Sequence, residues 1–447
     1  MDIPAGFLER MKESLGSGYG AFLECLQKSE VKALRQNPLK LSCGLPESLK
    51  AAWCLQNVPW EENGYYYEAS EDVMPPGKHP LHDAGAYYIQ EASAMYPVNL
   101  LSPQRDEKVL DLCAAPGGKS TQIASYMENS GLLVSNEIIR SRAEILSSNI
   151  ERMGVKNAVV ANMEPEEIAA AFPAFFDRVL VDAPCSGEGM MRRGDAAREN
   201  WSIENVLMCA SRQQEILQEA AKCVRPGGEL VYSTCTFSKE EDEDNVESFL
   251  SGHPDFSIIK TEKLYPHRIR GEGHFAALFE RRGELSLSAN YKRKKKSGNI
   301  DGLKNALGFL EGFLTEEAFD RIDPGRIISF KDSLYLLPEG IADVNGLKVL
   351  RPGLCLGSMK KDRFEPAHSL AMSLLPEDAK NTYDLPSDSP EAMDYLSGVS
   401  LTVPESAAKE LKDGWCIVTI GGISAGLGKK TGTVIKNHYP KGLRRVR

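Results

Sequence analysis

The fold of this 447-residue chain is decided by Val109-Leu110-Asp111-Leu112-Cys113-Ala114-Ala115-Pro116-Gly117-Gly118-Lys119. The apolar start is typical of a buried strand, the glycines of a tight loop, and residues 120–127 of a helix. A strand that passes through a glycine loop into a helix is the first unit of a doubly wound α/β sheet. Strands and helices alternate up to residue 283, so we expect a parallel-sheet core over 93–283.

The other elements of this core are predicted from short apolar runs and from helical spacing. Arg225-Pro226-Gly227-Gly228 predicts a sharp turn that leads into the last strand. The expected strands are 109–112, 132–136, 158–161, 178–182 and 230–233, and the expected helices are 120–127, 139–152 and 203–223.

Two cysteines follow strands of the expected sheet. Cys185 stands in Asp182-Ala183-Pro184-Cys185-Ser186-Gly187, and Cys235 stands in Ser233-Thr234-Cys235-Thr236. Because chemistry collects beyond the carboxyl ends of the strands, both thiols are expected to face one crevice, beside Asp182. A thiolate can add to a pyrimidine ring, and a carboxyl group can hold or move a proton at the edge of the base. These residues predict methyl transfer to a ring carbon, without saying which thiol adds.

The loop from Cys113 to Lys119 predicts a cofactor site, because its amides and the following helix start can approach a ligand closely. It lacks the Gly-x-Gly-x-x-Gly pattern of dinucleotide folds, and Cys113 stands where a phosphate loop has its first glycine. Glu137, at the end of the next strand, suits the two hydroxyls of a ribose. We therefore expect an adenosine cofactor without polyphosphate, and S-adenosylmethionine fits.

Composition restricts the class of protein further. The chain has a net charge of −10, ten cysteines and seven histidines, with no spacing typical of a metal site. No apolar run approaches the roughly 18 residues of a membrane span, and no signal peptide is evident, so we expect a cytoplasmic protein without membrane contact.

Two regions are basic in spite of the acidic total. Residues 292–296 read Lys-Arg-Lys-Lys-Lys, for which a solvated linker and an RNA contact are equally good interpretations. Residues 415–447 hold seven Lys or Arg and no acidic residue. Phosphate contacts depend on such local basic surface, so we expect contacts to RNA phosphates in the tail, from Lys429, Lys430, Arg444 and Arg445.

Three motifs together resemble those of the Nop/Sun RNA cytosine-5 methyltransferases, namely Cys113–Lys119, Asp182–Gly189 and Ser233–Phe237. The resemblance implies a Rossmann-like S-adenosylmethionine methyltransferase core in which Cys235 is the nucleophile and Cys185 helps to release the product. DNA cytosine methyltransferases attack with the Pro-Cys thiol and lack the Thr-Cys-Thr motif, so no DNA substrate is expected. The residues implied at the catalytic and cofactor sites are Lys119, Asp182 and the 113–119 loop, with Glu137, Glu164 and Arg142.

The resemblance reaches both ends of the chain. Leu34-Arg35-Gln36-Asn37 resembles a motif near the family's amino terminus, where Arg35 and Asn37 would either contact RNA or brace a turn. Residues 357–366 and 392–447 resemble the carboxyl-terminal extension of the bacterial RsmF-type members, which implies a 16S ribosomal RNA substrate and a PUA-like last domain. The expected parts are a small α+β domain (1–92), the methyltransferase core (93–283), a basic linker (284–300), a middle domain (301–385) and the PUA-like β domain (386–447).

Other functions remain open at this point. The same chemistry could act on tRNA, because only the carboxyl-terminal extension favours ribosomal RNA. An RNA-binding assembly factor with a vestigial catalytic domain is a second alternative, although Lys119, Glu137, Asp182, Cys185 and Cys235 form an intact set. An amino-methylating enzyme would need no thiol, and would carry Asn or Asp followed by Pro-Pro and an aromatic residue at 182–185. We expect a monomer.

Overall fold

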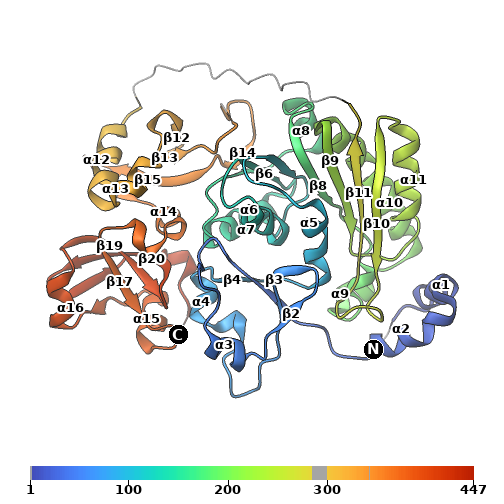
Figure 1. Cartoon of the computed structure of the whole chain (residues 1–447), viewed down its shortest axis with the longest axis horizontal. Helices are drawn as coiled ribbons and strands as arrows, with labels where there is room; N and C mark the ends of the chain where they lie inside the picture. Colours follow the sequence, from blue (N-terminus) through green and yellow to red (C-terminus); the bar gives the residue numbers. More distant parts are fainter. Residues whose placement is uncertain (1–2, 284–299, 342, 447) are drawn as a thin grey trace.

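The computed structural model describes residues 3–283, 300–341 and 343–446, which form four sheets (Figure 1). The basic run 292–296 lies outside these residues, so neither interpretation of it is tested. No helix of the described residues is long and apolar enough to cross a membrane. The same ranges contain no cluster of His, Cys, Asp and Glu that could hold a metal ion.

The largest sheet has eight strands in the order β10-β11-β9-β8-β5-β6-β7-β14. Its five central strands are parallel; β11 on one side and β14 on the other pair antiparallel with them, and β10 pairs antiparallel with β11. The strand order reverses between β5 and β8, which creates the switch point where ligands bind in such sheets. The bounds are β5 Lys108–Asp111, β6 Leu132–Asn136, β7 Ala158–Ala161, β8 Phe176–Asp182, β9 Val224–Thr234, β10 Phe256–Leu264, β11 His274–Arg281 and β14 Val349–Arg351.

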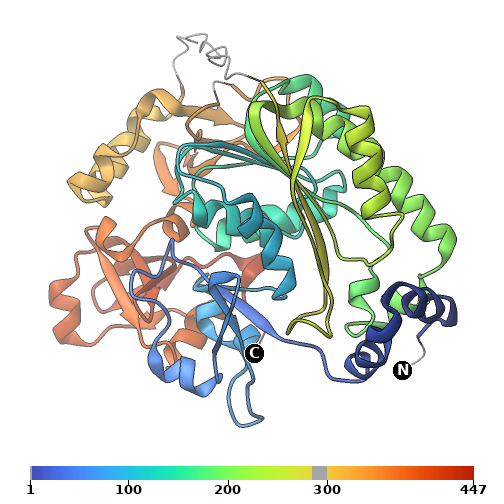
Figure 2. The same cartoon turned by 45° about the vertical axis from the view of Figure 1, so that its right-hand side comes forward.

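Helices cover both faces of this sheet, as Figure 2 shows. Val109 packs with the helices of one face and Leu110 with those of the other, because successive strand residues point to opposite sides. Burial on both faces explains why these strands are continuously apolar, and it confirms the doubly wound prediction. One face carries α5 Tyr96–Leu101, α6 Gly118–Tyr126 and α7 Arg140–Arg152, and the other α8 Pro165–Ala171, α10 Ile203–Cys223 and α11 Glu243–Gly252.

The sharp turn expected at 225–228 is a bulge within β9. Val224 pairs with Phe176 and Glu229 with Arg178, so residues 225–228 lie opposite Asp177 alone. Gly227 takes a positive φ of 69°, which glycine adopts without strain. The prediction of a turn was therefore wrong, because pairing with β8 keeps the chain in the sheet on both sides of the irregularity.

The first 92 residues divide between two places in the structure. The helices α1 Ala5–Leu15 and α2 Tyr19–Leu26 pack against Met191, Phe237 and Tyr265 of the core. The following residues form a separate four-stranded sheet in the order β2-β3-β1-β4, far from these helices in Figure 1. This sheet consists of β1 Ala33–Gln36, β2 Gln56–Val58, β3 Glu61–Tyr66 and β4 Tyr87–Ile89, with α3 Glu47–Ala52 and α4 Pro80–Asp83 beside it.

The carboxyl-terminal part has two further sheets, and its boundaries differ from those expected. β14 lies between 301 and 385 but pairs with β7, so the expected middle domain contributes a strand to the core sheet. β17 Thr382–Leu385 pairs in parallel with β19 Gly414–Ile420, so the last sheet begins before residue 386. The other strands are β12 Ile327–Phe330, β13 Ser333–Leu336, β15 Leu354–Lys360, β16 Arg363–Pro366, β18 Leu401–Thr402, β20 Ile423–Thr431 and β21 Val434–Asn437, and the helices are α12 Leu303–Phe313, α13 Glu316–Asp320, α14 His368–Ser373, α15 Pro390–Leu396 and α16 Glu405–Glu410.

Candidate active site

The two cysteines singled out in the sequence lie side by side beyond the ends of β8 and β9. Their sulfur atoms are 3.1 Å apart, and the backbone N–H of Cys235 donates to Cys185 Sγ at 3.3 Å. The hydrogen bond with Cys235, together with burial, raises the pKa of the Cys185 thiol well above its usual value. Cys185 therefore keeps its proton at neutral pH, which suits a donor to a neighbouring sulfur better than a nucleophile.

Asp182 ends β8, accepts hydrogen bonds from two side chains and lies close to a third. Lys119 Nζ lies 2.7 Å from Oδ2, Ser233 Oγ donates to Oδ1 at 2.9 Å, and His274 Nε2 lies 3.4 Å from Oδ1.

Burial alone would raise the pKa of Asp182, but the charge of Lys119 and the interaction with His274 hold it well below its usual range. Burial likewise opposes the charge on Lys119, and Asp182 outweighs it, so the pKa of Lys119 is raised. The pair is ionised at neutral pH.

His274 is a residue of this site that the sequence did not reveal. It begins β11, a strand between β10 and β9 that was not predicted, and its side chain is only 3% exposed. Burial and the charge of Lys119 lower the pKa of His274, so the ring is neutral at pH 7. Nε2 has no hydrogen-bond partner within normal geometry among the described residues. No motif or spacing connects this histidine with Asp182, since pairing between β9 and β11 brings them together.

The predicted cofactor loop lies at the same edge, between β5 and α6. Gly117 has a φ of 112° and precedes the helix, which leaves the first backbone amides of α6 free of partners within the helix. Ser120 Oγ donates to Asp111 Oδ2 at 2.7 Å, whereas Asp111 Oδ1 is buried without a hydrogen-bond partner in the described part of the chain. Burial raises the pKa of Asp111 to about 7 and also raises the pKa of Cys113.

Glu137 and Arg142 lie together next to this loop. The carboxylate of Glu137 accepts the Ile139 N–H at 2.9 Å, and Arg142 Nη1 is 3.4 Å from its other oxygen. Arg142 also donates to the carbonyl oxygen of Ala115 at 3.0 Å, so it connects the acidic residue to the loop. Glu164 is exposed and forms a capping box with Glu167 at the start of α8, which engages its carboxylate in the helix cap.

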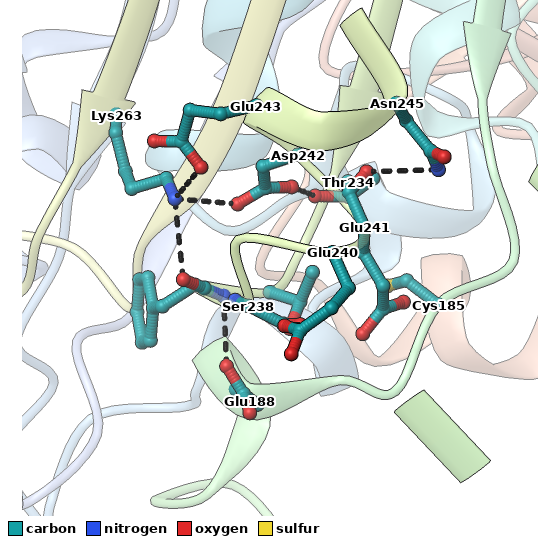
Figure 3. A network of polar contacts seen from close by, with 12 residues as sticks. Cys185, Glu188, Thr234, Ser238, Glu240, Glu241, Asp242, Glu243, Asn245 and Lys263 are labelled. Atoms are coloured by element: carbon teal, nitrogen blue, oxygen red, sulfur yellow. Dashed lines mark hydrogen bonds and ion pairs between the residues drawn. The ribbon is translucent and has the colours of Figure 1, made fainter. Parts of the chain in front are cut away.

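A second polar network holds the segment after Cys235 (Figure 3). Thr234 Oγ1 donates to Asp242 Oδ1 at 2.7 Å, and Lys263 Nζ lies 2.9 Å from the other oxygen of this buried carboxylate. The backbone N–H of Phe237 donates to Glu188 Oε2 at 3.0 Å. The chain on both sides of Cys235 is thus tied to neighbouring elements.

Arg35 and Asn37 do not reach the surface, so of the two interpretations offered for them the structure favours bracing the chain over contact with RNA. Arg35 is 1% exposed and donates to Thr121 Oγ1 at 2.8 Å and to the carbonyl oxygen of Gly118 at 3.2 Å. Asn37 is fully buried and donates to the carbonyl oxygens of Gly85 and Met153 at 2.8 and 2.9 Å. Both brace the chain, and Arg35 links the amino-terminal sheet to the helix of the cofactor loop.

The four basic residues of the tail have different surroundings. Lys429 is exposed, with its ammonium 5.8 Å from the centre of the Trp415 ring. Lys430 is only 4% exposed and pairs with Asp413 at 2.8 Å, which makes its expected phosphate contact wrong in this conformation. Arg445 pairs with Asp83, and Arg444 Nη2 donates to the carbonyl oxygen of Tyr439 at 3.2 Å, so both are partly used inside the molecule.

Four family descriptions match consecutive parts of the chain. They are the N-terminal domain of 16S rRNA methyltransferase RsmF (residues 3–92), 16S rRNA methyltransferase RsmB/F (98–280), the RsmF rRNA methyltransferase first C-terminal domain (311–374) and the methyltransferase RsmF PUA domain (382–445). The resemblance found in the sequence and the PUA-like last domain are thereby confirmed.

Individual proteins agree with these matches. The ribosomal RNA small subunit methyltransferase F of Vibrio vulnificus (strain YJ016) is 34% identical over 466 residues, covering 99% of this chain and 97% of that protein. The protein of the same name from Escherichia coli O127:H6 is 33% identical over 469 residues, covering 98% and 96%. A solved methyltransferase homolog from Pyrococcus horikoshii is 27% identical, with a TM-score of 0.55, covering 62% of this chain and 94% of that one. Since the matches extend over nearly its whole length, the chain belongs to the RsmF family of 16S ribosomal RNA methyltransferases.

Proposed function

We propose that this enzyme methylates carbon 5 of a cytosine in 16S ribosomal RNA and uses S-adenosylmethionine as the methyl donor. The observation that carries the proposal is the pair of thiols 3.1 Å apart beside the ionised Asp182–Lys119 pair, at the edge of the sheet that bears the glycine loop. An RNA methyltransferase that modifies an amino group or a ribose has no use for two thiols in this place.

The residues at the loop fit the proposed cofactor. Glu137 would offer its carboxylate to ribose hydroxyls, and the start of α6 would offer backbone N–H groups. Asp111 Oδ1, which is buried and has no partner among the residues that the structure describes, is a further acceptor for a polar ligand. S-adenosylmethionine, when bound, supplies a methyl group from its sulfonium centre. Glu164 and Arg142 would lie at the margin of such a ligand.

Cys235 would start the reaction. Its thiolate forms a bond to carbon 6 of the cytosine, and the electron pair of the 5,6 double bond moves toward the ring nitrogen 3. The Asp182–Lys119 pair would face that edge of the base, where the ammonium of Lys119, held by Asp182, donates the hydrogen bond or proton that stabilises the added charge. Carbon 5 then has the electron density needed to accept a methyl group.

Cys185 would act in release. The proton on carbon 5 is lost to water, the electron pair re-forms the 5,6 double bond, and the bond between Cys235 and carbon 6 breaks. The protonated thiol of Cys185 lies 3.1 Å from Cys235 Sγ, where it can donate a hydrogen bond to the departing sulfur. The Cys235 thiolate is then ready for another cycle.

All these side chains come from one chain, so we propose that a monomer is active. Because the substrate is ribosomal RNA, we place the reaction in the cytoplasm.

The test of the proposed function is bisulfite sequencing of total RNA from a strain that lacks the protein, beside the same strain complemented with it. One or a few 16S cytosines should lose protection in the deletion strain and regain it on complementation. A change confined to tRNA would overturn the ribosomal substrate, and no change in any RNA would overturn the reaction.

A further inference from the structure

We propose that Gln213 and Glu241, hereafter the clamp, fix the loop of Cys185 against Cys235 and thereby control the release of the covalent intermediate rather than its formation. Nothing in the sequence motifs points to either residue. The proposal rests on the roles proposed above for the two thiols. It concerns positioning, because neither residue reaches the sulfur atoms.

Glu241 is completely buried beneath the two cysteine loops, and its carboxylate is directed toward the Cys185 loop in Figure 3. One of its oxygens accepts the backbone N–H of Ser186 at 2.9 Å, and the other accepts the hydroxyl of Ser186. Ser186 follows Cys185 directly, so Glu241 holds the chain on the carboxyl side of this thiol. A buried carboxylate that accepts several hydrogen bonds holds its donors firmly.

Gln213 holds the other side of the same thiol from α10. Its Nε2 donates to the carbonyl oxygen of Pro184 at 2.9 Å and to Glu241 Oε2 at 2.8 Å. Its Oε1 accepts from Tyr232 and from Asn245, both at 2.9 Å, so the amide cannot turn without losing partners. The residues before and after Cys185 are therefore bound by one connected pair of side chains.

The clamp also reaches the Cys235 loop. The hydroxyl groups of Ser186 and Thr236 lie 2.9 Å apart, and the backbone N–H of Gly189 donates to the carbonyl oxygen of Cys235 at 2.8 Å. The two loops that carry the thiols are thus joined through the residues next to each thiol. This arrangement fixes the distance between the sulfur atoms.

The two thiols depend on the clamp to different extents. Cys235 directly follows β9, and Thr234 is tied independently to Asp242, so addition to the base needs little from the clamp. Cys185 lies in irregular chain beyond β8, where no sheet pairing holds residues 184–187. Without the clamp, Cys185 would leave its place beside Cys235 while Cys235 stays in position. Release should therefore slow more than addition.

The experiment compares full-length variants with 16S ribosomal RNA and S-adenosylmethionine. Gln213→Leu removes the bonds to Pro184 and Glu241, and Glu241→Ala removes those to Ser186. Glu241→Gln is the conservative variant, because one amide oxygen can still accept the Ser186 N–H and its amide nitrogen can donate to the Ser186 hydroxyl. Gln218→Leu, at an exposed position of the same helix, is the matched control. Thermal melting verifies that each variant is folded.

Two quantities are measured: the rate of the first methyl transfer and the fraction of protein in a denaturant-resistant RNA adduct during turnover. For Gln213→Leu and Glu241→Ala we expect steady-state turnover to fall about tenfold, with the first transfer changed much less and the adduct fraction increased. Glu241→Gln and Gln218→Leu should behave like the unaltered protein.

The outcomes separate this proposal from the proposed function. If Cys185→Ala accumulates adduct but Gln213→Leu and Glu241→Ala lose both rates equally and accumulate none, the clamp proposal is wrong and the roles of the thiols stand. If Glu241→Gln is as impaired as Glu241→Ala, the positioning argument also fails. If Cys185→Ala itself accumulates no adduct, the release role is wrong and the clamp proposal falls with it.

Discussion

Lys119 and Asp182 meet across the switch point of the sheet, with Nζ 2.7 Å from Oδ2. Lys119 comes from the start of the helix after β5, and Asp182 is the last residue of β8. The contact unites the predicted cofactor loop with the predicted catalytic carboxylate. It also keeps that carboxylate ionised, since burial without a positive partner would favour its protonated form.

Replacing Lys119 with Met should make this dependence visible in the pH profile. Without the positive charge of Lys119, the effect of burial raises the pKa of Asp182. The acidic limb of the rate profile should therefore move to higher pH. We expect the single-turnover rate at pH 7 to fall at least about a hundredfold, within the range common for acid–base groups. Single-turnover methylation measured between pH 5 and 9 tests this. An unchanged acidic limb would show that Asp182 does not titrate in the reaction.

The two thiols should give opposite results when each is removed. Cys235→Ala should form neither 5-methylcytosine nor an adduct, because no thiolate remains to add to carbon 6. Cys185→Ala should still add and transfer the methyl group but retain the RNA, since the departing sulfur has lost its hydrogen-bond donor. Denaturing gels with labelled RNA distinguish the two. An adduct with Cys235→Ala would reverse the assignment of the nucleophile.

His274→Phe should weaken catalysis through Asp182 with little effect on folding, since a ring of similar size fills the same space. Loss of the His274 interaction lets burial raise the pKa of Asp182, although Lys119 still opposes the change. We therefore expect a smaller shift of the acidic limb than for Lys119→Met, in the same direction. Equal pH profiles for His274→Phe and the unaltered protein would remove His274 from the catalytic unit.

The sequence predicted the site residues at the edge of the sheet better than the residues that hold them in place. Short motifs with fixed local geometry predicted Lys119, Asp182 and both thiols, because each lies at or just beyond the end of a strand in a sheet whose layout is regular. His274, Gln213 and Glu241 come from elements that meet only after folding, so no local pattern connects them with the thiols. The same reason explains the error at Lys430, whose partner Asp413 lies just before the acid-free tail.

Asp111 should make the free energy of unfolding depend on pH, and the substitution Asp111→Asn should remove this dependence. Its pKa is about 7 in the folded chain because of burial, against an ordinary value of 3.8. The folded state therefore binds more protons between about pH 4 and 7, and the contribution of Asp111 to stability falls as the pH rises through that window. Between pH 5 and pH 8, the free energy of unfolding of the unaltered protein should therefore fall relative to that of Asp111→Asn by on the order of 3 kcal/mol.

Chemical denaturation at several pH values measures this difference. An asparagine oxygen can still accept the Ser120 hydroxyl, so the comparison isolates the charge. A difference in unfolding free energy between Asp111→Asn and the unaltered protein that stays constant from pH 5 to 8 would contradict the raised pKa.

Arg35 and Lys429 provide a paired test of which basic residues contact the RNA and which stabilise the fold. Arg35→Met should reduce the free energy of unfolding by about 3 kcal/mol, because buried acceptors such as the Gly118 carbonyl oxygen lose their donor. Lys429→Met should leave stability nearly unchanged, since the side chain is exposed, but weaken RNA binding and reduce its salt dependence. Denaturant unfolding and filter binding at several salt concentrations measure the two effects. If Arg35→Met instead remains fully stable and reduces the salt dependence of binding, Arg35 contacts phosphate in the complex, and the buried position seen here is not the one that binds RNA.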